Sequence, residues 1–380
     1  MGLIEGTRFP WSDSANVAID VSGTLSMLDP SDVPILSLVG KDGLTAEALR
    51  HEWLEDRLRP LDSNVVTLGL LSGVTSPANN VVITTTHGAI FRANDLVLVT
   101  SAVGAELTRV GVTPAADTLE LHRGYGGSAI LSHTGLPTLA IIGNVNATDA
   151  PAGTARSTAK VGLYNFCQIY EDAVTVTSTT QAIKKWVEQN DLDAQLERAI
   201  KAAWMQYERT LLHGRRVAPS AGVPGAMDGI LARLTTNVFA QAGAPLTEPM
   251  VLGAMQASWV AGGAIDTICV GAFQKRRLNM FLDTMRRTPR TDRIAGSVVD
   301  TYTSDFGTAD IVLARQMPAN AVLFLDRQRI KFGPLREHAL SAAPIPQATR
   351  LTQTMQIIGQ YTSETRNESA HALITALSTA

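Results

Sequence analysis

The sequence is poor in cysteine and has no long hydrophobic run. Its two cysteines, Cys167 and Cys269, cannot form a disulfide framework, and no spacing fits a zinc site. We expect both to be buried as small apolar residues. No run of 18 apolar residues occurs, so no membrane-spanning helix is predicted. The residues after Met1 lack the basic start and apolar core of a signal peptide. We therefore expect a soluble protein made inside the cell.

An excess of charge of either sign is also lacking, since 32 basic residues face 35 acidic ones and give a net charge of −3. That balance argues against a dedicated nucleic-acid binder, which normally carries a basic domain or stripe. Lysine is scarce, with seven residues against 25 arginines, and arginine suits multidentate contacts between protein surfaces. With 45% apolar residues, the chain can fold as a globular protein of two or three domains.

Catalytic and metal-binding motifs are missing too. The sequence has no P-loop, no nucleophile elbow and no HExxH pair. The nearest approach to a ligand cluster is His51, Glu52, Glu55 and Asp56, but a strand here places only two of them on each face. We interpret this cluster as a solvated face. An enzyme of this size usually leaves one recognisable constellation, so we expect no enzyme activity, no metal and no cofactor.

Two further motifs have an ordinary explanation. Residues 122–127, HRGYGG, could form a phosphate nest, but a turn whose glycines take positive φ explains them better. The basic clusters at 275–277 and 286–290 lack the interleaved aromatic residues of a nucleic-acid patch. They are better explained as solvated helix surface or as contacts between subunits.

The chain changes character along its length. Residues 1–45 hold three prolines and no lasting period, so this apolar arm is expected to lie on another surface. Residues 51–58 favour a strand. Short β-branched runs then alternate with turn residues and predict a compact antiparallel barrel or sandwich. The six runs are 65–71, 80–86, 95–101, 106–113, 118–124 and 138–143.

The second half of the chain mixes helices and strands. After a small-residue linker at 146–159, residues 160–182 predict one long, bent strand. Apolar residues at spacings of three and four predict a long helix over 191–213. A second helix begins at Thr247, with Pro249 in its first turn. The remaining expectations are a helix at 273–285 and strands at 265–271, 308–316, 321–332, 349–364 and 371–377.

Several strings, taken in order, resemble the major capsid proteins of tailed double-stranded-DNA bacteriophages. None of them is a catalytic motif, and their specificity comes from order and spacing over most of the chain outside 63–158. The strings are LDPSDVPILSLVG, HEWLEDRL, NFCQIYEDAVTVTSTTQA, ERTLLHG, VDTYTSDFGTADIVLARQMPANAVLFLD and QIIGQYTSETRNESAHALI.

The resemblance implies an α+β protein with the Hong Kong 97-type capsid fold. In that fold an N-terminal arm and a two-stranded E-loop reach over neighbouring subunits, a P-domain carries a long spine helix, and an A-domain gathers around symmetry axes. Residues 63–158 depart from this pattern and are expected to be a β-module inserted at the E-loop. The other expected parts are the arm 1–45, the E-loop 46–62 and 159–180, the P-domain 181–235 and 326–380 with spine helix 191–213, and the A-domain 236–325.

The implied function is a structural subunit that self-assembles into the icosahedral shell of a virion, in the host cytoplasm. The implied partners are further copies in pentamers and hexamers, a portal at one vertex, and packaged DNA enclosed without sequence-specific binding. The short arm implies a separate scaffolding protein, and a decoration or cement protein is a further candidate. Only Lys160 lies near the returning part of the E-loop, so we expect no lysine–asparagine cross-link.

Contacts between subunits are assigned to apolar anchors and to arginines, because aromatic residues and arginine dominate many interfaces. The candidates are Leu28, Ile35, Trp53, Leu54, Phe166, Ile169, Tyr170, Arg276, Arg277, Arg286 and Arg287. Two alternatives stay open. One is an encapsulin-like cellular compartment shell with the same fold, and the other is a hydrolase with a dispersed site that includes His51 and Glu55.

Overall fold

The computed structural model describes ten stretches of the chain, which divide into two compact units. The smaller, here called the barrel unit, is Leu54–Val161, and the larger unit combines Met1–Trp53 with Gly162–Ala380. No helix in the described stretches is long and apolar enough to cross a membrane. The stretches are 32–41, 43–58, 61–67, 80–111, 117–133, 136–148, 157–183, 190–282, 300–346 and 351–379.

The barrel unit contains six antiparallel strands that close in the order β2-β3-β6-β5-β4-β7. Leu119, Leu121 and Leu139 are among the fully buried side chains that fill its interior. The predicted barrel or sandwich is therefore a barrel. Its elements are β2 (Asp62–Thr67), β3 (Asn80–Thr85), η1 (Gly88–Ile90), β4 (Asp95–Ser101), β5 (Gly104–Val110), β6 (Thr118–His122), η2 (Tyr125–Gly127) and β7 (Thr138–Asn144).

A buried ion pair fastens the loop after β6 to the barrel. The side chains of Glu106 on β5 and Arg123 are fully buried, and the guanidinium donates from Nε at 2.9 Å and from Nη2 at 2.6 Å. The same carboxylate accepts the backbone N–H of Leu131 at 3.1 Å. The predicted glycine turn is confirmed, because its glycines take positive φ; they are Gly124, Gly126 and Gly127.

Two strands that extend from the larger unit form a ribbon, and the chain continues from it into a sheet. β1 (Arg50–Glu55) pairs with β8 (Val161–Phe166). The chain then bends at Cys167, whose backbone N–H donates to the Leu49 carbonyl oxygen at 2.8 Å. β9 (Gln168–Thr177) follows, with α2 (Ser178–Ala182) at its end. The prediction of one bent strand over 160–182 is therefore wrong, because β8 and β9 belong to different sheets.

The long strand β17 (Thr352–Thr365) organises that second sheet. It pairs antiparallel with β9 along one edge and with β15 (Ile330–Pro334) and β16 (Ser341–Ile345) along the other. Gly333 on β15 is required by a close approach, since a Cβ there would lie 1.7 Å from the Leu44 carbonyl oxygen. The strand predicted at 349–364 is thus confirmed, and it is the longest in the described chain.

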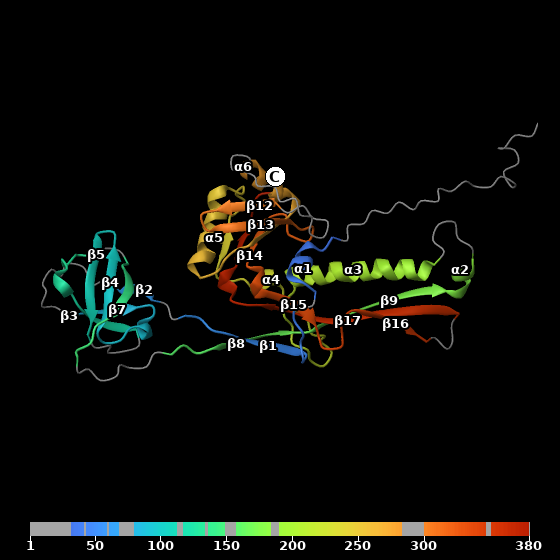
Figure 1. Ribbon diagram of the computed structural model, residues 1–380, viewed down its shortest axis with the longest axis horizontal. Helices are drawn as coiled ribbons and strands as arrows, with labels where there is room; N and C mark the ends of the chain where they lie inside the picture. The colour runs from blue at the N-terminus through green and yellow to red at the C-terminus, as the bar shows by residue number, and fades with distance from the viewer. Residues whose placement is uncertain are drawn as a thin grey trace, which may run out of the picture. The chain divides into compact units, whose positions relative to one another are not determined.

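The predicted long helix is α3 (Asp191–His213), which runs beside β9 and β17 (Figure 1). Its buried side meets the sheet through an aromatic cluster centred on Tyr207. The ring of Tyr361 lies 4.7 Å and that of Trp204 5.8 Å from the Tyr207 ring, centroid to centroid. The Tyr207 hydroxyl donates to the Gly359 carbonyl oxygen at 2.9 Å. The helix and the sheet therefore pack as two layers that are held rigidly together.

The rest of the larger unit is a six-stranded mixed sheet in the order β10-β18-β14-β11-β13-β12. The central runs TICV and VLFL are buried at every residue, as expected for strands covered on both faces. The elements are α4 (Ile230–Arg233), β10 (Val238–Ala240), α5 (Glu248–Val260), β11 (Thr267–Val270), α6 (Ala272–Leu282), β12 (Asp300–Ser304), β13 (Gly307–Leu313), β14 (Val322–Leu325), η3 (Arg327–Arg329), η4 (Glu368–Ala370) and β18 (Ala372–Thr375).

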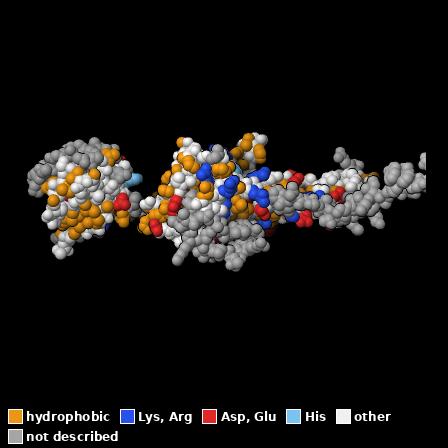
Figure 2. Space-filling view, turned by 90° about the horizontal axis from the view of Figure 1, so that it is seen from above, with side chains coloured by type: hydrophobic (Ala, Val, Ile, Leu, Met, Phe, Trp, Pro, Cys, Tyr) orange, Lys and Arg blue, Asp and Glu red, His pale blue; other side chains and the backbone are white. Residues whose placement is uncertain are grey.

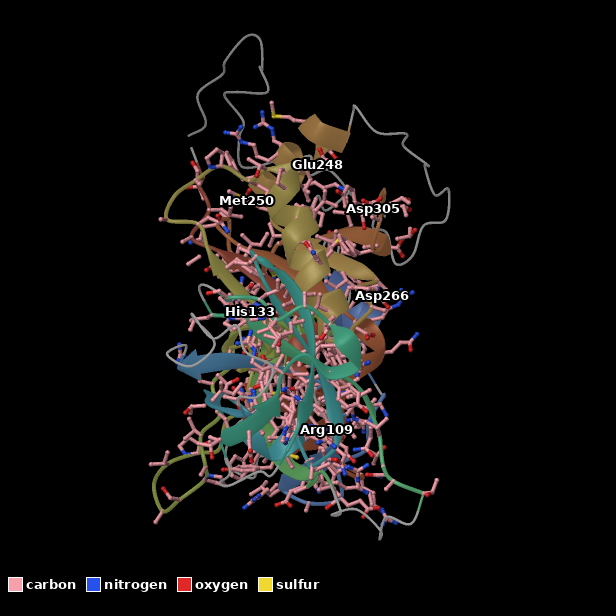
Figure 3. All side chains as sticks on the ribbon, turned by 90° about the vertical axis from the view of Figure 1, so that its left-hand side faces the viewer. Arg109, His133, Glu248, Met250, Asp266 and Asp305 are labelled. Atoms are coloured by element: carbon pink, nitrogen blue, oxygen red, sulfur yellow. The ribbon has the colours of Figure 1, made fainter. Side chains whose placement is uncertain are left out.

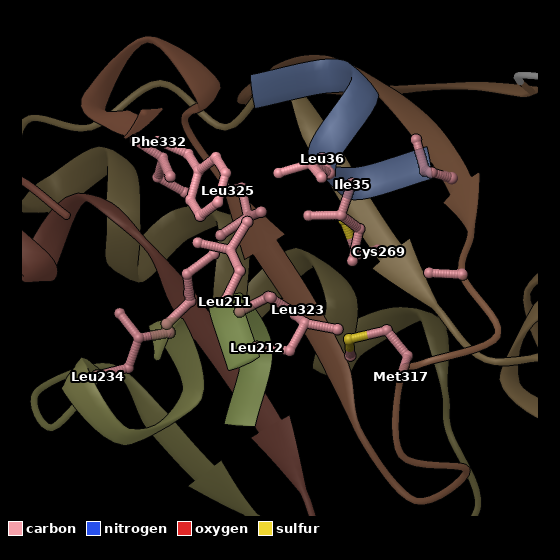
Figure 4. Close-up of a cluster of buried hydrophobic side chains, with 14 of the residues drawn as sticks. Ile35, Leu36, Leu211, Leu212, Leu234, Cys269, Met317, Leu323, Leu325 and Phe332 are labelled. Carbon is pink, nitrogen blue, oxygen red and sulfur yellow. The ribbon is translucent and has the colours of Figure 1, made fainter. Parts of the chain in front are cut away.

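Alternating side chains of this sheet fill two separate cores. On β14, Val322 and Phe324 join the core under α5 and α6, whereas Leu323 and Leu325 point to the opposite core. Ile35 and Leu36 of the short helix α1 (Pro34–Val39) are fully buried in that opposite core, together with the end of α3 (Figure 4). Cys269 is also buried there, as predicted, and Cys167 is buried beside the ribbon.

The strand predicted at 321–332 is wrong as a single element. Asp326 accepts the backbone N–H of Gln328 and caps the turn η3, so the chain leaves the mixed sheet as β14 and enters the other sheet as β15. The strands β10, β12 and β16 were not predicted. They lie at sheet edges, where few apolar residues are needed and the alternating pattern is weak.

Candidate subunit-contact surfaces

The ribbon of β1 and β8 starts from a rigid root in the larger unit. The buried amide of Asn165 donates to the carbonyl oxygen and the hydroxyl of Ser363 at 2.8 and 3.0 Å. Its oxygen accepts the backbone N–H groups of Asp228 and Phe166 at 2.8 and 2.9 Å. One side chain therefore joins the ribbon, β17 and the loop before α4, which fixes the direction in which the ribbon leaves the sheet.

A second polar contact holds the other strand of the ribbon. The Nε2 atom of His51 on β1 lies 3.7 Å from Oε2 of Glu364, whose other oxygen accepts from Arg366 Nε at 2.6 Å. Burial acts to raise the pKa of the Glu364 carboxyl, but the close contact with His51 and the hydrogen bond and charge of Arg366 outweigh it and lower that pKa. Glu364 is therefore an ionised anchor for the ribbon at neutral pH.

Two of the predicted contact residues expose apolar surface. Leu54 on β1 is 70% exposed and Ile169 at the start of β9 is 55% exposed. The strand alternation explains Leu54, because its neighbours Trp53 and Glu55 point to the buried side. Leu54 and Ile169 stay candidates for contacts with another subunit.

Other predicted contact residues are part of the chain's own interior. Ile35 lies in the core beneath α1, and Trp53 is buried with the Arg233 guanidinium 5.9 Å from its ring. Phe166 is buried and packs edge-on against Tyr164 at 5.7 Å. Trp53 and Phe166 therefore stabilise the ribbon's root and Ile35 the core beneath α1, so each exposes little surface in the chain. Their contact with another subunit stays a prediction. Tyr170 is partly buried, with its ring 5.5 Å from that of Tyr207.

Of the four predicted arginine candidates, two lie in the described part of the chain. On α6, Arg276 is exposed, whereas Arg277 is partly buried with its guanidinium 5.7 Å from the Phe273 ring. Figure 2 shows lysine and arginine side chains gathered on one face of the larger unit. Leu28, Arg286 and Arg287 lie outside the described residues.

The described residues show no group of three or more His, Cys, Asp or Glu side chains able to hold a metal ion. His51 and Glu55 share the buried side of β1, as a strand requires, and His51 contacts Glu364 as described above. In the barrel, His133 joins Ser101 Oγ at 2.8 Å and Glu106 Oε2 at 3.2 Å. This resembles a catalytic triad, but the carboxylate already binds Arg123, so the arrangement is a buried polar network that holds a loop.

Two features of the larger unit were not found from the sequence. Glu208 is fully buried on α3, although glutamate is mostly exposed in folded proteins. Trp259 is 60% exposed at the end of α5, although tryptophan is highly buried on average. The packing of α1 against α3 buries Glu208, and the turn after β12 places the Phe306 ring beside Trp259. Both contacts join segments that are far apart in the sequence, so no local sequence pattern predicts them.

The described parts are a long helix packed along a sheet, a second mixed sheet, and a ribbon with an exposed apolar side. This arrangement fits a structural subunit that contacts other copies of itself. The class that these parts define is the shell-forming capsid protein of the Hong Kong 97 type. The model of the SU10 major capsid protein family matches residues 4–378, and the chain belongs to this family. It is therefore a structural subunit of a phage capsid shell, located in the virion and assembled from many copies. This family describes a capsid protein, so the encapsulin-type alternative has weaker support.

Solved structures share the fold over nearly the full length. A structure of Microbacterium phage Oxtober96 is 12% identical and covers 97% of this chain and 98% of its own, with a TM-score of 0.52. One of Mycobacterium phage Cain is 9% identical, with the same coverage and TM-score. The capsid of a native GTA particle is 9% identical and covers 98% and 99%, with a TM-score of 0.51. No curated protein sequence matches the chain.

Proposed function

We propose that copies of this chain form the pentamers and hexamers of a closed icosahedral shell around phage double-stranded DNA, assembled in the host cytoplasm. The observation that carries the proposal is the ribbon of β1 and β8, which leaves a root fixed by Asn165 and exposes Leu54. A ribbon of this kind can lie on a neighbouring subunit and enlarge the interface beyond that between two globular surfaces.

The proposal includes an assignment of the parts of the chain. The ribbon and its continuation, 46–62 and 159–180, act as the E-loop, and 63–158 is a barrel module inserted into it. Residues 1–45 are the arm, 181–235 and 326–380 the P-domain, and 236–325 the A-domain. Arg276 and Arg277 then belong to the part that gathers around the symmetry axes.

The proposed partners follow from the shell. A portal occupies one vertex, a separate scaffolding protein guides assembly, and a decoration or cement protein is a candidate ligand of the outer surface. The DNA is enclosed and not bound by sequence, which agrees with a net charge of −3 because a strongly basic wall would hold phosphate tightly. The proposal contains no catalytic step, no cofactor and no covalent cross-link between subunits.

Replacing Leu54 by aspartate tests the contact of the ribbon. The wild-type protein, expressed together with the other structural proteins of its phage so that a scaffolding protein is supplied, should form closed shells under negative-stain electron microscopy. Leu54→Asp should fold but yield more than about tenfold fewer shells, because a carboxylate would be desolvated in the contact. The matched control is Leu136→Asp, outside the ribbon and just before β7, where Leu136 is 66% exposed. Normal shells from Leu54→Asp would refute the ribbon contact, and an absence of shells from the wild type would refute the assembly itself.

A denaturing gel of isolated shells tests the non-covalent part of the proposal. We expect a single band at the mass of the chain, 40.5 kDa. A ladder of covalent multimers that persists under reducing conditions would show a cross-link and contradict it.

A further inference from the structure

The helix α5 lacks the polar outer side that a surface helix needs. Its sequence, EPMVLGAMQASWV, carries one charged residue, Glu248 in the first turn. A helix that is uncharged around its circumference is normally covered on all sides. Here only the side that includes Val251 and Met255 is buried against the sheet. The opposite side is exposed at spacings of four, three and four residues; it consists of Pro249, Gly253, Gln256 and Val260.

Gly253 lies in the middle of this exposed side, and no contact with a described residue explains why this position is a glycine. Glycine in a helix interior is destabilising relative to alanine. A Cβ added at Gly253 would meet no atom of the described residues within 4 Å, so no neighbouring described element requires a glycine there. A residue without a side chain permits another surface to approach the helix closely at this point.

The exposed side ends in a patch of aromatic, apolar and acidic residues. Trp259 is 60% and Val260 72% exposed, and the Trp259 ring lies 6.1 Å from that of Phe306 in the turn between β12 and β13. Asp305, next to Phe306, is exposed. Figure 3 shows Glu248 and Asp305 at the same end of the larger unit. We call Trp259, Val260, Asp305 and Phe306 the α5 patch.

The chemistry that complements this patch is present on α6 of the same chain. Residues 272–282 include Lys275, Arg276 and Arg277 and no acidic residue. Arg276 is exposed, and Met280, one turn later on the same side, is 68% exposed. An arginine with a flexible apolar side chain beside it suits a surface that offers a carboxylate next to a tryptophan.

We propose that the α5 patch of one subunit packs against α6 of a second copy, with Asp305 facing Arg276 and Trp259 covering Met280. Because the patch and its complement are different surfaces of one chain, the contact is head-to-tail. When the same contact is repeated around a rotation axis, the subunits form a closed ring that needs no other protein. The inference rests on the proposed shell and names the surface through which the subunits of a ring meet.

Paired cysteines test this contact directly. Trp259→Cys combined with Met280→Cys should form disulfides between subunits in assembled particles, and a non-reducing gel should show a ladder that ends at five or six chains. Each single cysteine variant should stay monomeric on the gel, and the native Cys167 and Cys269 are buried. Dimers from a single variant, or a double variant that stays monomeric, would overturn the contact.

A charge exchange gives an independent readout. Asp305→Arg and Arg276→Asp should each reduce the number of closed shells more than tenfold, and the double variant should restore at least half of them. The same far-ultraviolet circular dichroism for all three would show that the subunits fold. Equal assembly by every variant, or no rescue in the double variant, would refute the pairing. Loss of shells from the wild type would count against the proposed function and not against this contact alone.

Discussion

Replacing Glu208 by glutamine should change how the free energy of unfolding depends on pH. The Glu208 side chain is fully buried between α3 and α1. One carboxylate oxygen accepts the Leu36 backbone N–H at 3.1 Å, and the other has no hydrogen-bond partner among the described residues. Burial raises the pKa of this carboxyl to about 7, although the backbone N–H groups of Leu36 and Ile35 act to lower it and the nearby Asp32 adds to the rise.

The sign and size of the effect follow from that raised pKa. The ordinary value for this carboxyl is 4.5, so the folded chain holds its proton more tightly than the unfolded chain does. Stability is then lost as the pH rises from 4.5 towards 7 and stays constant above it. Each pH unit in this range corresponds to about 1.4 kcal/mol, which gives a total of about 3 kcal/mol.

A second buried group acts in the opposite direction, so only a difference between variants isolates Glu208. Burial lowers the pKa of His371 from 6.5 to about 4, and the chain therefore loses stability as the pH falls below 6.5. Unassembled subunits of the wild type and of Glu208→Gln should be unfolded in urea at several pH values from 4.5 to 8.5. The stability of the variant relative to the wild type should rise by about 2–3 kcal/mol over this range.

The control is Glu197→Gln on the same helix, where the Glu197 side chain is 72% exposed. Its stability difference from the wild type should be small and nearly constant with pH. If Glu208→Gln also gave a difference that does not vary with pH, the buried carboxyl would not govern the docking of α1, and the argument would be refuted.

Three further substitutions test the packing. Asn165→Ala should lower the free energy of unfolding of the larger unit by about 3 kcal/mol in urea titration, since it leaves several buried partners unsatisfied; a loss below 1 kcal/mol would contradict this. Arg123→Met should destabilise the barrel by about 3–5 kcal/mol because the Glu106 carboxylate is left buried without its partner, and unchanged hydrogen exchange in β5 would refute it. Tyr207→Phe should cost about 1 kcal/mol, because one hydrogen bond to Gly359 is lost while the ring stays in place; a thermal midpoint equal to that of the wild type would argue against it.

Much of the fold was predictable where a local pattern has only one good solution. The β-branched runs separated by glycine, proline and asparagine predict six short antiparallel strands, and they close into a barrel because no other element is available to cover them. The stripe from Leu192 to Leu211 predicts α3 because its period and length exclude a strand. In both cases the information lies within a few residues of the element itself.

The prediction failed where neighbours in space decide the structure. Residues 321–332 look like one apolar strand, but Asp326 can accept a backbone N–H two residues later and turn the chain between two sheets. Glu208 looks like a solvated helix residue until α1, about 170 positions earlier in the sequence, places the amide of Leu36 against it. No window of the sequence contains both partners of such a contact.

The contact residues show why apolar character alone does not identify an interface. Trp53 and Leu54 are adjacent and both apolar, yet the strand turns Trp53 towards the chain's own interior and leaves Leu54 70% exposed. Composition cannot separate them, because the hydrophobic effect is the same for a side chain buried in its own core and for one buried by a neighbour. Exposure in the isolated chain does separate them. By the same argument Trp259, which is 60% exposed, is a stronger candidate for a subunit contact than Phe166, which the chain has already covered.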